Sequence, residues 1–179
     1  MDLIASFSSQ TVRSFHFFKL KGLIHNQIMN FLFDTGAAFS VIGVNHLLKP
    51  GQHTDEVKKQ LLREAFIKES KRQGIKERGE NLRAANNAMI VTYPCICHGV
   101  SIEGAAEMDF CFDFALSDIN LPLLGGSFMN DCAYSHSIDG SVIVSGMKDN
   151  PGMGLYRNIP VVDFNRAVSN MQKDGFFTL

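Results

Sequence analysis

A run of bulky apolar side chains meets a single carboxylate at residues 31–42, which are Phe31-Leu32-Phe33-Asp34-Thr35-Gly36-Ala37-Ala38-Phe39-Ser40-Val41-Ile42. The apolar residues before Asp34 predict a buried strand, and the Thr-Gly pair after it predicts a tight loop. A carboxylate at the edge of a core is costly unless it is hydrogen-bonded or shares a proton. Asp34 therefore has either a structural task in a turn or a chemical one.

A second segment further along the chain completes a pattern with the first one. It reads Leu121-Pro122-Leu123-Leu124-Gly125-Gly126-Ser127-Phe128. The two segments together resemble the signature of retropepsin-like aspartic proteases, in which an apolar strand leads to Asp-Thr-Gly-Ala, and two apolar residues and a glycine follow near the end of the domain. The resemblance covers roughly residues 14–145 and leaves both ends of the chain outside it.

The resemblance implies a mostly β fold: a closed β-barrel or sheet with a flap hairpin, in an obligate homodimer. Such proteases activate a water molecule between two carboxylates that share one proton, without a cofactor or a metal. This chain carries one Asp-Thr-Gly, so the second Asp34 must come from a symmetric partner. We therefore expect an aspartic endopeptidase with Asp34, Thr35 and Gly36 as its catalytic residues.

The same resemblance implies that a polypeptide substrate lies extended between the loop and a flap. The flap candidate is the stretch 82–91, whose tip carries Asn-Asn where relatives usually carry glycine. Many viral relatives also pair an Arg after the second-motif glycine with an Asp near the loop, and this chain has Gly126 and Ala38 there. The residues expected to bind substrate are Ala37, Ala38, Ala85, Asn86, Asn87 and Leu123.

Further strands are predicted on both sides of the loop. A turn at His25-Asn26 separates two of them, and Asp139-Gly140 predicts a hairpin over 137–145. The expected strands span 15–24, 27–33, 39–44, 96–102 and 108–114. We expect one domain over residues 1–179, with a helical insertion at about 54–80 and a C-terminal extension over 146–179.

Three helices are predicted from capping residues and spacing. Thr54 is expected to cap the insertion helix, and Ser127 a short helix ending at about Cys132. Pro160 is expected to open a helix over 161–173. The basic residues of the insertion suggest a nucleic-acid surface, but the interspersed glutamates favour an ordinary solvated face. The apolar face expected for the insertion helix consists of Val57, Leu61, Leu62, Ala65 and Phe66.

Composition excludes several functional classes. The chain has 179 residues, 45% hydrophobic and 20% charged, with a net charge of −1, which gives no electrostatic basis for nucleic-acid or membrane partners. No apolar run has the length of a membrane span, and the N-terminus lacks the features of a secretory signal. Four cysteines do not indicate a disulfide scaffold, so we expect reduced thiols and a cytoplasmic location.

Two other functions remain open from the sequence. The fold can serve as a non-catalytic dimerisation or peptide-binding module, because a fold does not establish an activity. Cys95, Cys97 and His98 suggest a zinc site, although a closed site needs about four ligands and buried core cysteines are favoured.

In relatives the chain ends build a sheet between the two subunits. Residues 3–7 and 176–179 are apolar and β-prone enough to form such a sheet here.

Overall fold

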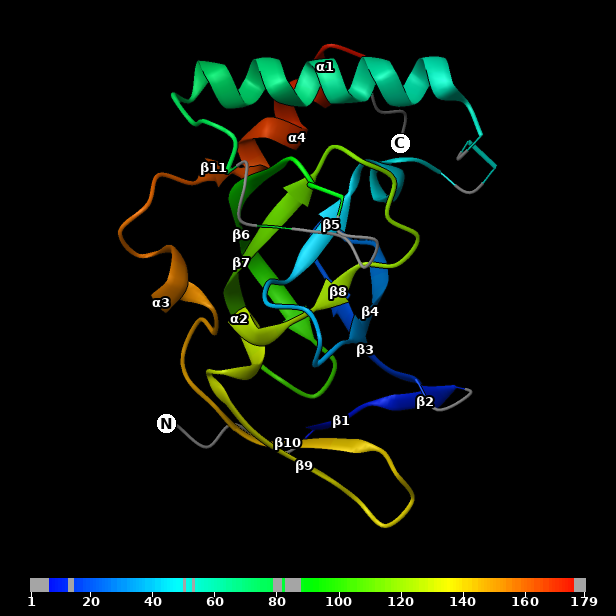
Figure 1. The fold of residues 1–179 in the computed structure, drawn as a ribbon, viewed down its shortest axis with the longest axis vertical. Helices are drawn as coiled ribbons and strands as arrows, with labels where there is room; N and C mark the ends of the chain where they lie inside the picture. Colours follow the sequence, from blue (N-terminus) through cyan, green and yellow to red (C-terminus); the bar gives the residue numbers. More distant parts are fainter. Residues whose placement is uncertain are drawn as a thin grey trace.

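The computed structural model describes residues 7–12, 15–49, 51–52, 54–78, 82 and 88–175, and the protein is mostly β with few helices (Figure 1). A barrel lies at the centre, and helices Glu56–Arg72 (α1) and Phe164–Lys173 (α4) lie at one end of it. A small sheet lies at the opposite end (Figure 1). None of the helices in the described ranges is both long and apolar enough to cross a lipid bilayer.

Six strands close the barrel in the order β6-β7-β5-β8-β4-β3, and β3 pairs again with β6. Closure removes the open edges that a flat sheet would expose. This strand order confirms the expectation of a closed, mostly β barrel. The strands are Phe15–Lys21 (β3), Ile28–Phe33 (β4), Val41–Gly43 (β5), Thr92–Ile102 (β6), Glu107–Ala115 (β7) and Leu123–Leu124 (β8). Two short strands, Gln10–Val12 (β2) and Val162–Asp163 (β11), extend the same sheet.

The core is built largely from phenylalanine. The ring of Phe31 from β4 meets the ring of Phe110 from β7 edge-on at 5.7 Å, and Phe110 stacks on Phe112 at 5.6 Å. All three side chains are fully buried. Edge-on and offset contacts of this kind add about 0.5–1.5 kcal/mol each beyond the burial of their area. The apolar run that leads to Asp34 is therefore held by buried aromatic contacts in the core.

The hairpin of β3 and β4 delivers the Asp34 loop. Its turn places His25 at φ 48° and Asn26 at φ 57°, the left-handed region that a tight turn requires, as the sequence predicts. Strand β3 ends at Lys21 rather than at residue 24, because Gly22 turns the chain at φ 105° against the carbonyl of Gly99. A Cβ at Gly22 would lie 2.6 Å from that oxygen, so a side chain cannot be accommodated there.

A three-stranded sheet packs below the barrel. It has the order β1-β10-β9, from Phe7–Ser8 (β1), Cys132–His136 (β9) and Val142–Met147 (β10). The predicted hairpin about Asp139-Gly140 is confirmed, since it joins β9 to β10. Phe7 contacts Phe18 of β3 edge-on at 5.7 Å, which anchors this sheet to the barrel.

Helix α1 forms within the predicted insertion, but its cap and its buried face differ from the prediction. Asp55, and not Thr54, caps the helix by accepting a hydrogen bond from the backbone N–H of Lys58 at 3.0 Å. Val57 and Leu61 are 72% and 47% exposed, whereas Leu62, Ala65 and Phe66 are buried as predicted. The buried face instead includes Lys59 and Glu69, polar residues that the apolar pattern assigns to solvent.

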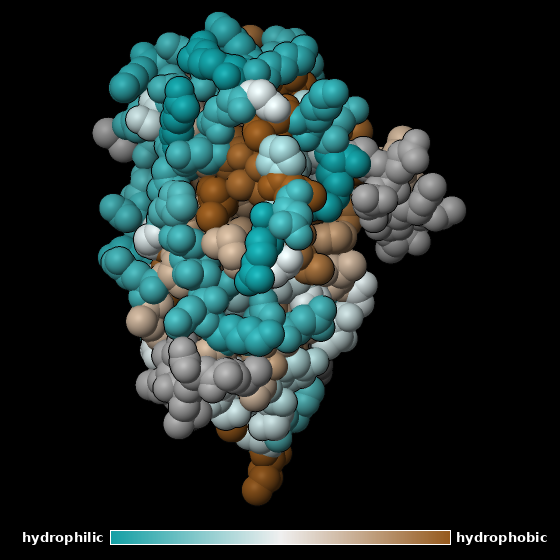
Figure 2. All heavy atoms as spheres, turned by 90° about the vertical axis from the view of Figure 1, so that its left-hand side faces the viewer, coloured by the Kyte–Doolittle hydropathy of each residue, from teal (hydrophilic) through white to brown (hydrophobic). Residues whose placement is uncertain are grey.

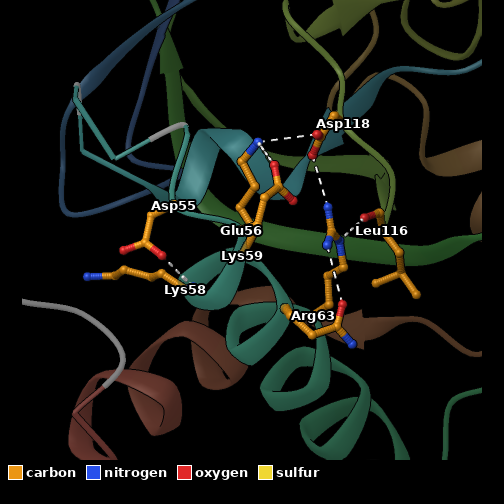
Figure 3. A network of polar contacts seen from close by, with 8 residues as sticks. Asp55, Glu56, Lys58, Lys59, Arg63, Leu116 and Asp118 are labelled. Atoms are coloured by element: carbon orange, nitrogen blue, oxygen red, sulfur yellow. Dashed lines mark hydrogen bonds and ion pairs between the residues drawn. The ribbon is translucent and has the colours of Figure 1, made fainter.

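An ion-pair network explains why a lysine lies on the buried face of α1 (Figure 3). Lys59 is 4% exposed, and its ammonium contacts Asp118 at 3.2 Å and Glu56 at 3.4 Å. Arg63 also bonds Asp118, at 3.0 Å, and its Nε donates to the Leu116 carbonyl at 2.7 Å. Paired charges tolerate burial that an isolated ammonium does not. The network fixes α1 to the segment that leads from β7 to β8.

The remaining helices are shorter or begin later than predicted. The short helix Gly126–Met129 (α2) has Gly125 at its N-cap, and Ser127 does not cap it. A one-turn helix, Met153–Tyr156 (α3), forms in the C-terminal extension, and a 3-10 turn, Val44–Leu47 (η1), follows β5. Pro160 does not open α4, because β11 intervenes and the Asp163 side chain caps the helix at the N–H of Arg166.

Candidate active site

Asp34 follows directly after β4, and β8 lies beside it. Leu32 pairs with Leu123 and Phe33 with Leu124 in parallel, and the Asp34 N–H donates to the Leu124 carbonyl at 2.9 Å. Backbone pairing and this hydrogen bond place the second motif directly against the Asp34 loop.

The loop and the second motif are joined further by backbone hydrogen bonds. The N–H groups of Gly126 and Ser127 donate to the carbonyls of Ala37 and Ala38, at 2.8 Å and 2.9 Å. Gly125 lies so close to the loop that a Cβ built on it would be 2.3 Å from the Phe39 carbonyl oxygen. Glycine is therefore required at this crossing, because any side chain would force the two segments apart.

Two buried serines complete the crossing. The Ser127 hydroxyl accepts a hydrogen bond from the Ser40 N–H at 3.0 Å, and the Ser40 hydroxyl accepts one from the Gly125 N–H at 3.3 Å. The two side chains are less than 2% exposed and lie 3.4 Å apart at their oxygens. Ser127 is buried against the loop, which is why it does not cap α2. The places of the viral Arg–Asp pair, Gly126 and Ala38, contribute backbone groups instead.

The other side of the loop is open to solvent. Thr35, Gly36 and Ala38 are exposed, and Asp34 is half-buried. The Gly36 N–H donates to Asp34 Oδ1 at 2.9 Å, which orients the carboxylate, and the Ala37 N–H donates to the Asp34 carbonyl at 3.2 Å. Within the described ranges no second carboxylate is hydrogen-bonded or ion-paired to Asp34. One chain thus presents a rigid, exposed loop with a single oriented carboxylate.

The predicted substrate-binding residues divide into two groups. Ala37, half-buried, and Ala38, exposed, lie at the crossing, and the half-buried Leu123 lies two residues before Gly125. Ala85, Asn86 and Asn87, the tip of the predicted flap, lie outside the described residues. At the base of that stretch the Ile90 N–H donates to the Leu82 carbonyl at 3.0 Å, so these two residues lie opposite each other.

A buried carboxylate behind the loop is the main feature that the sequence analysis missed. Asp113 of β7 is fully buried, and its backbone N–H donates to the Ser40 carbonyl at 2.8 Å. Three side chains satisfy the carboxylate: Arg78 Nε at 2.7 Å, Thr92 Oγ1 at 2.7 Å and the Tyr156 hydroxyl at 2.6 Å. A charge-assisted bond of this kind contributes about 1.5–3 kcal/mol. The one available signal was an acid between two phenylalanines, Phe112 and Phe114, within a predicted strand.

This buried cluster touches the loop and includes residues on either side of the flap candidate. The Arg78 guanidinium lies 4.7 Å from the centre of the Phe39 ring and 5.3 Å from that of Tyr156, within the range of cation–π attraction. The Arg78 N–H also donates to the Thr92 carbonyl at 2.7 Å, across residues 79–91. Burial, followed by the charge of Asp113, raises the pKa of Tyr156, so the phenol stays protonated and remains a donor.

The zinc alternative is not supported by the positions of its residues. Cys95 and Cys97 are fully buried in the core, as the sequence favoured, whereas the His98 ring is half exposed and bonds Asp109 at 2.9 Å. Burial raises the pKa of Cys97 to about 12, which opposes the thiolate that zinc requires. Among the residues that the structure describes, no group of three or more His, Cys, Asp or Glu side chains converges on a metal position.

Comparisons with known proteins find similarity among solved structures alone. No family model matches the chain, and no curated protein matches it. Among solved structures, a retropepsin-like aspartic protease from Rickettsia conorii is similar, with a TM-score of 0.41 and 12% sequence identity, over 78% of this chain and 89% of that chain. Similarity at this level assigns neither a family nor an activity to the chain.

The crossing at Gly125 leads to a stability prediction. Gly125→Ala should lower the free energy of unfolding by about 3 kcal/mol, because the new methyl group meets backbone carbonyls that cannot rotate away. Gly126→Ala is the matched control: its Cβ would lie 3.1 Å from the Ala38 oxygen at the start of a helix, so we expect a loss below about 1 kcal/mol. Urea unfolding measures both variants, and equal losses would contradict the crossing described here.

The Asp113 cluster leads to a second stability prediction. Tyr156→Phe removes one donor from a fully buried carboxylate and should lower the free energy of unfolding by about 2 kcal/mol. Tyr134→Phe is the control, because this tyrosine is 39% exposed, and it should change stability by less than about 0.5 kcal/mol. Thermal unfolding at neutral pH compares the two, and a Tyr156→Phe protein as stable as the control would refute the assigned hydrogen bond.

Proposed function

We propose that this chain is an aspartic endopeptidase of the retropepsin-like type, with an active site made from Asp34 of two copies. The observation that carries the proposal is the fixed crossing of the Asp34 loop with the Leu124–Gly125 segment. It combines an oriented, half-exposed carboxylate with a loop that backbone hydrogen bonds hold rigid on one side and leave open on the other. Preorganisation of this kind is what acid–base catalysis by a carboxylate requires.

The chemistry follows from placing two such carboxylates together. Like charges in contact cannot both ionise easily, so the pair holds one proton between its two members. The ionised Asp34 removes a proton from a water molecule, which attacks the peptide carbonyl carbon. The protonated Asp34 donates a hydrogen bond to the carbonyl oxygen as negative charge develops there. The Asp34 that took the proton from water then transfers it to the amide nitrogen, the C–N bond breaks as the carbonyl re-forms, and the carboxylate pair returns to its starting state.

The surrounding residues take roles in binding under this proposal. Thr35 and Gly36, both exposed, face the second copy and the substrate backbone. Ala37, Ala38 and Leu123 form a small apolar floor on which an extended peptide binds through main-chain hydrogen bonds. The stretch with Ala85, Asn86 and Asn87 closes over the peptide from the other side. The substrate class is polypeptide, with apolar side chains next to the cleaved bond.

Asp34→Asn tests the proposal directly. The change keeps the shape of the side chain and removes the acid, so peptide cleavage by the purified protein should fall by at least about 10³-fold, while the unfolding midpoint stays the same. Asp149→Asn, which removes an exposed carboxylate after β10, is the control and should cleave at the wild-type rate. Cleavage by Asp34→Asn at more than a tenth of the wild-type rate would rule out the catalytic assignment. A wild-type protein that binds peptides without cleaving them would favour the non-catalytic module.

A further inference from the structure

One side of β7 is covered by a short segment of the C-terminal extension. Three residues of β7 alternate with the buried phenylalanines of the core and therefore direct their side chains to the opposite face of the strand: Asp109, Cys111 and Asp113. Residues 150–156, here called the strap, contain α3, which contacts β7 (Figure 1). The end of the extension, 176–179, and residues 3–6 lie outside the described residues, so the sheet predicted from the chain ends stays a prediction.

Three contacts tie the strap to β7, one at every third residue of the strap. They join Asn150 Oδ1 to the Asp109 N–H at 2.8 Å, Met153 Sδ to the Cys111 thiol at 3.6 Å, and the Tyr156 hydroxyl to the Asp113 carboxylate at 2.6 Å. The contact between the two sulfur atoms is the middle one. A change that separates the sulfur atoms therefore acts on the whole strap, and in particular on Tyr156 in the same helical turn.

The backbone of the strap has no room to move toward the barrel. The Gly152 N–H donates to Asp131 Oδ2 at 2.6 Å, and a Cβ built on Gly152 would lie 3.1 Å from the Ser127 carbonyl oxygen. The strap thus packs directly against α2, the helix that follows the second motif. Interiors of this density do not compress, so any added atom at the sulfur contact displaces the strap outward.

The two sulfur atoms differ in their reactivity toward oxidants. Cys111 is 1% exposed, and burial, followed by the charge of Asp109, raises the pKa of its thiol to about 12, so it is not the reactive thiolate. Met153 is half-buried, and a thioether reacts without losing a proton. Figure 2 faces the side of the molecule that carries α3 and shows apolar side chains at the surface among hydrophilic ones. An oxidant in solution therefore reaches the thioether before the thiol.

We propose that Met153 is a site of reversible oxidation by peroxides, and that the sulfoxide releases the strap from β7. The thioether sulfur gives two electrons to one oxygen of hydrogen peroxide, and a sulfur–oxygen bond forms as the oxygen–oxygen bond breaks. The proton on the transferred oxygen passes to the departing hydroxide, which leaves as water. A methionine sulfoxide reductase reverses the change with two electrons from a dithiol.

The sulfoxide does not fit where the two sulfur atoms now meet. These atoms are in van der Waals contact at 3.6 Å, so an oxygen atom on Met153 Sδ needs space that only an outward movement of the strap provides. Movement outward also gives the polar sulfur–oxygen bond the hydration that the covered face of β7 denies it. Tyr156 then moves with the strap and leaves the buried Asp113 without one of its donors.

Release of the strap has a consequence for the candidate active site. The Asp113 N–H donates to the Ser40 carbonyl at the base of the Asp34 loop, so disturbance of Asp113 loosens the support of that loop. Oxidation of Met153 should therefore lower peptide cleavage. This effect on cleavage rests on the proposed function, whereas the oxidation itself and the release of the strap do not depend on it.

Peroxide treatment of the whole chain tests the proposal with two readouts. Peptide mapping by mass spectrometry locates the added oxygen, and amide hydrogen exchange follows the strap, whose hydrogen-bonded N–H groups include those of Gly152, Met153 and Leu155. Oxidised protein should exchange these groups at least about tenfold faster and cleave peptide at least about tenfold more slowly than before treatment. Both values should return after incubation with methionine sulfoxide reductases and dithiothreitol.

Met153→Leu keeps the volume of the side chain and removes the sulfur, so its strap and its cleavage rate should withstand the same treatment. Met29→Leu is the matched control, because Met29 is also half-buried but lies on β4, and this variant should respond as the wild-type protein does. All proteins carry Met89→Leu, because Met89 is 53% exposed and would oxidise as well. Each rate is compared with that of the same protein before oxidation.

The outcomes separate this inference from the proposed function. A strap that exchanges equally before and after oxidation of Met153, or a Met153→Leu protein that loses strap protection as the wild-type protein does, would overturn the inference. Unchanged cleavage with a released strap would overturn the link to the Asp34 loop. Reversible release of the strap in a protein that never cleaves peptide would support the oxidation site and contradict the proposed function.

Discussion

The close approach of Gly125 to the Asp34 loop is the constraint on which the rest of the structure depends. Carbonyls from the loop and N–H groups from the second motif meet there with no side chain between them. Strand β8 lies parallel to β4 in the closed barrel, and this crossing holds the chain directly after β8. The same bonds hold Asp34 at the rim of the core, where its carboxylate is oriented by a backbone N–H and still reaches solvent. The same contacts thus hold the barrel strands together and position the candidate catalytic carboxylate.

The second support of the loop is electrostatic and comes from distant parts of the chain. Asp113 is buried behind Ser40 and is neutralised by Arg78, with Thr92 and Tyr156 as further donors. Breaking a buried pair of this kind costs more than its formation gains, because the remaining charge stays in the core. The cluster therefore resists movement of the strands that flank the loop. Tyr156 belongs to the C-terminal extension, which gives that extension a structural role at the candidate site.

Much of this architecture was predictable from local sequence. Short sequence patterns, each compatible with few local structures, identify three features. These are the apolar run before Asp34, the His25-Asn26 turn and the Gly125-Gly126 pair. The Asp113 cluster was not predictable, because its four side chains are spread over residues 78–156 and meet only in the folded barrel. The buried face of α1 was misassigned for a related reason. Lys59 is buried because Asp118, far along the chain, pairs with it. The spacing of apolar residues along α1 does not indicate such a distant partner.

The account requires two copies of Asp34 in one active site, and inhibitor stoichiometry measures that requirement most directly. A statine-containing peptide carries a hydroxyl that mimics the tetrahedral intermediate and needs both carboxylates to bind. Isothermal titration calorimetry of the wild-type protein should give one inhibitor for every two chains, and Asp34→Asn should show no binding heat. A stoichiometry of one inhibitor per chain, or binding that survives the loss of the Asp34 acid, would contradict a site shared between two chains.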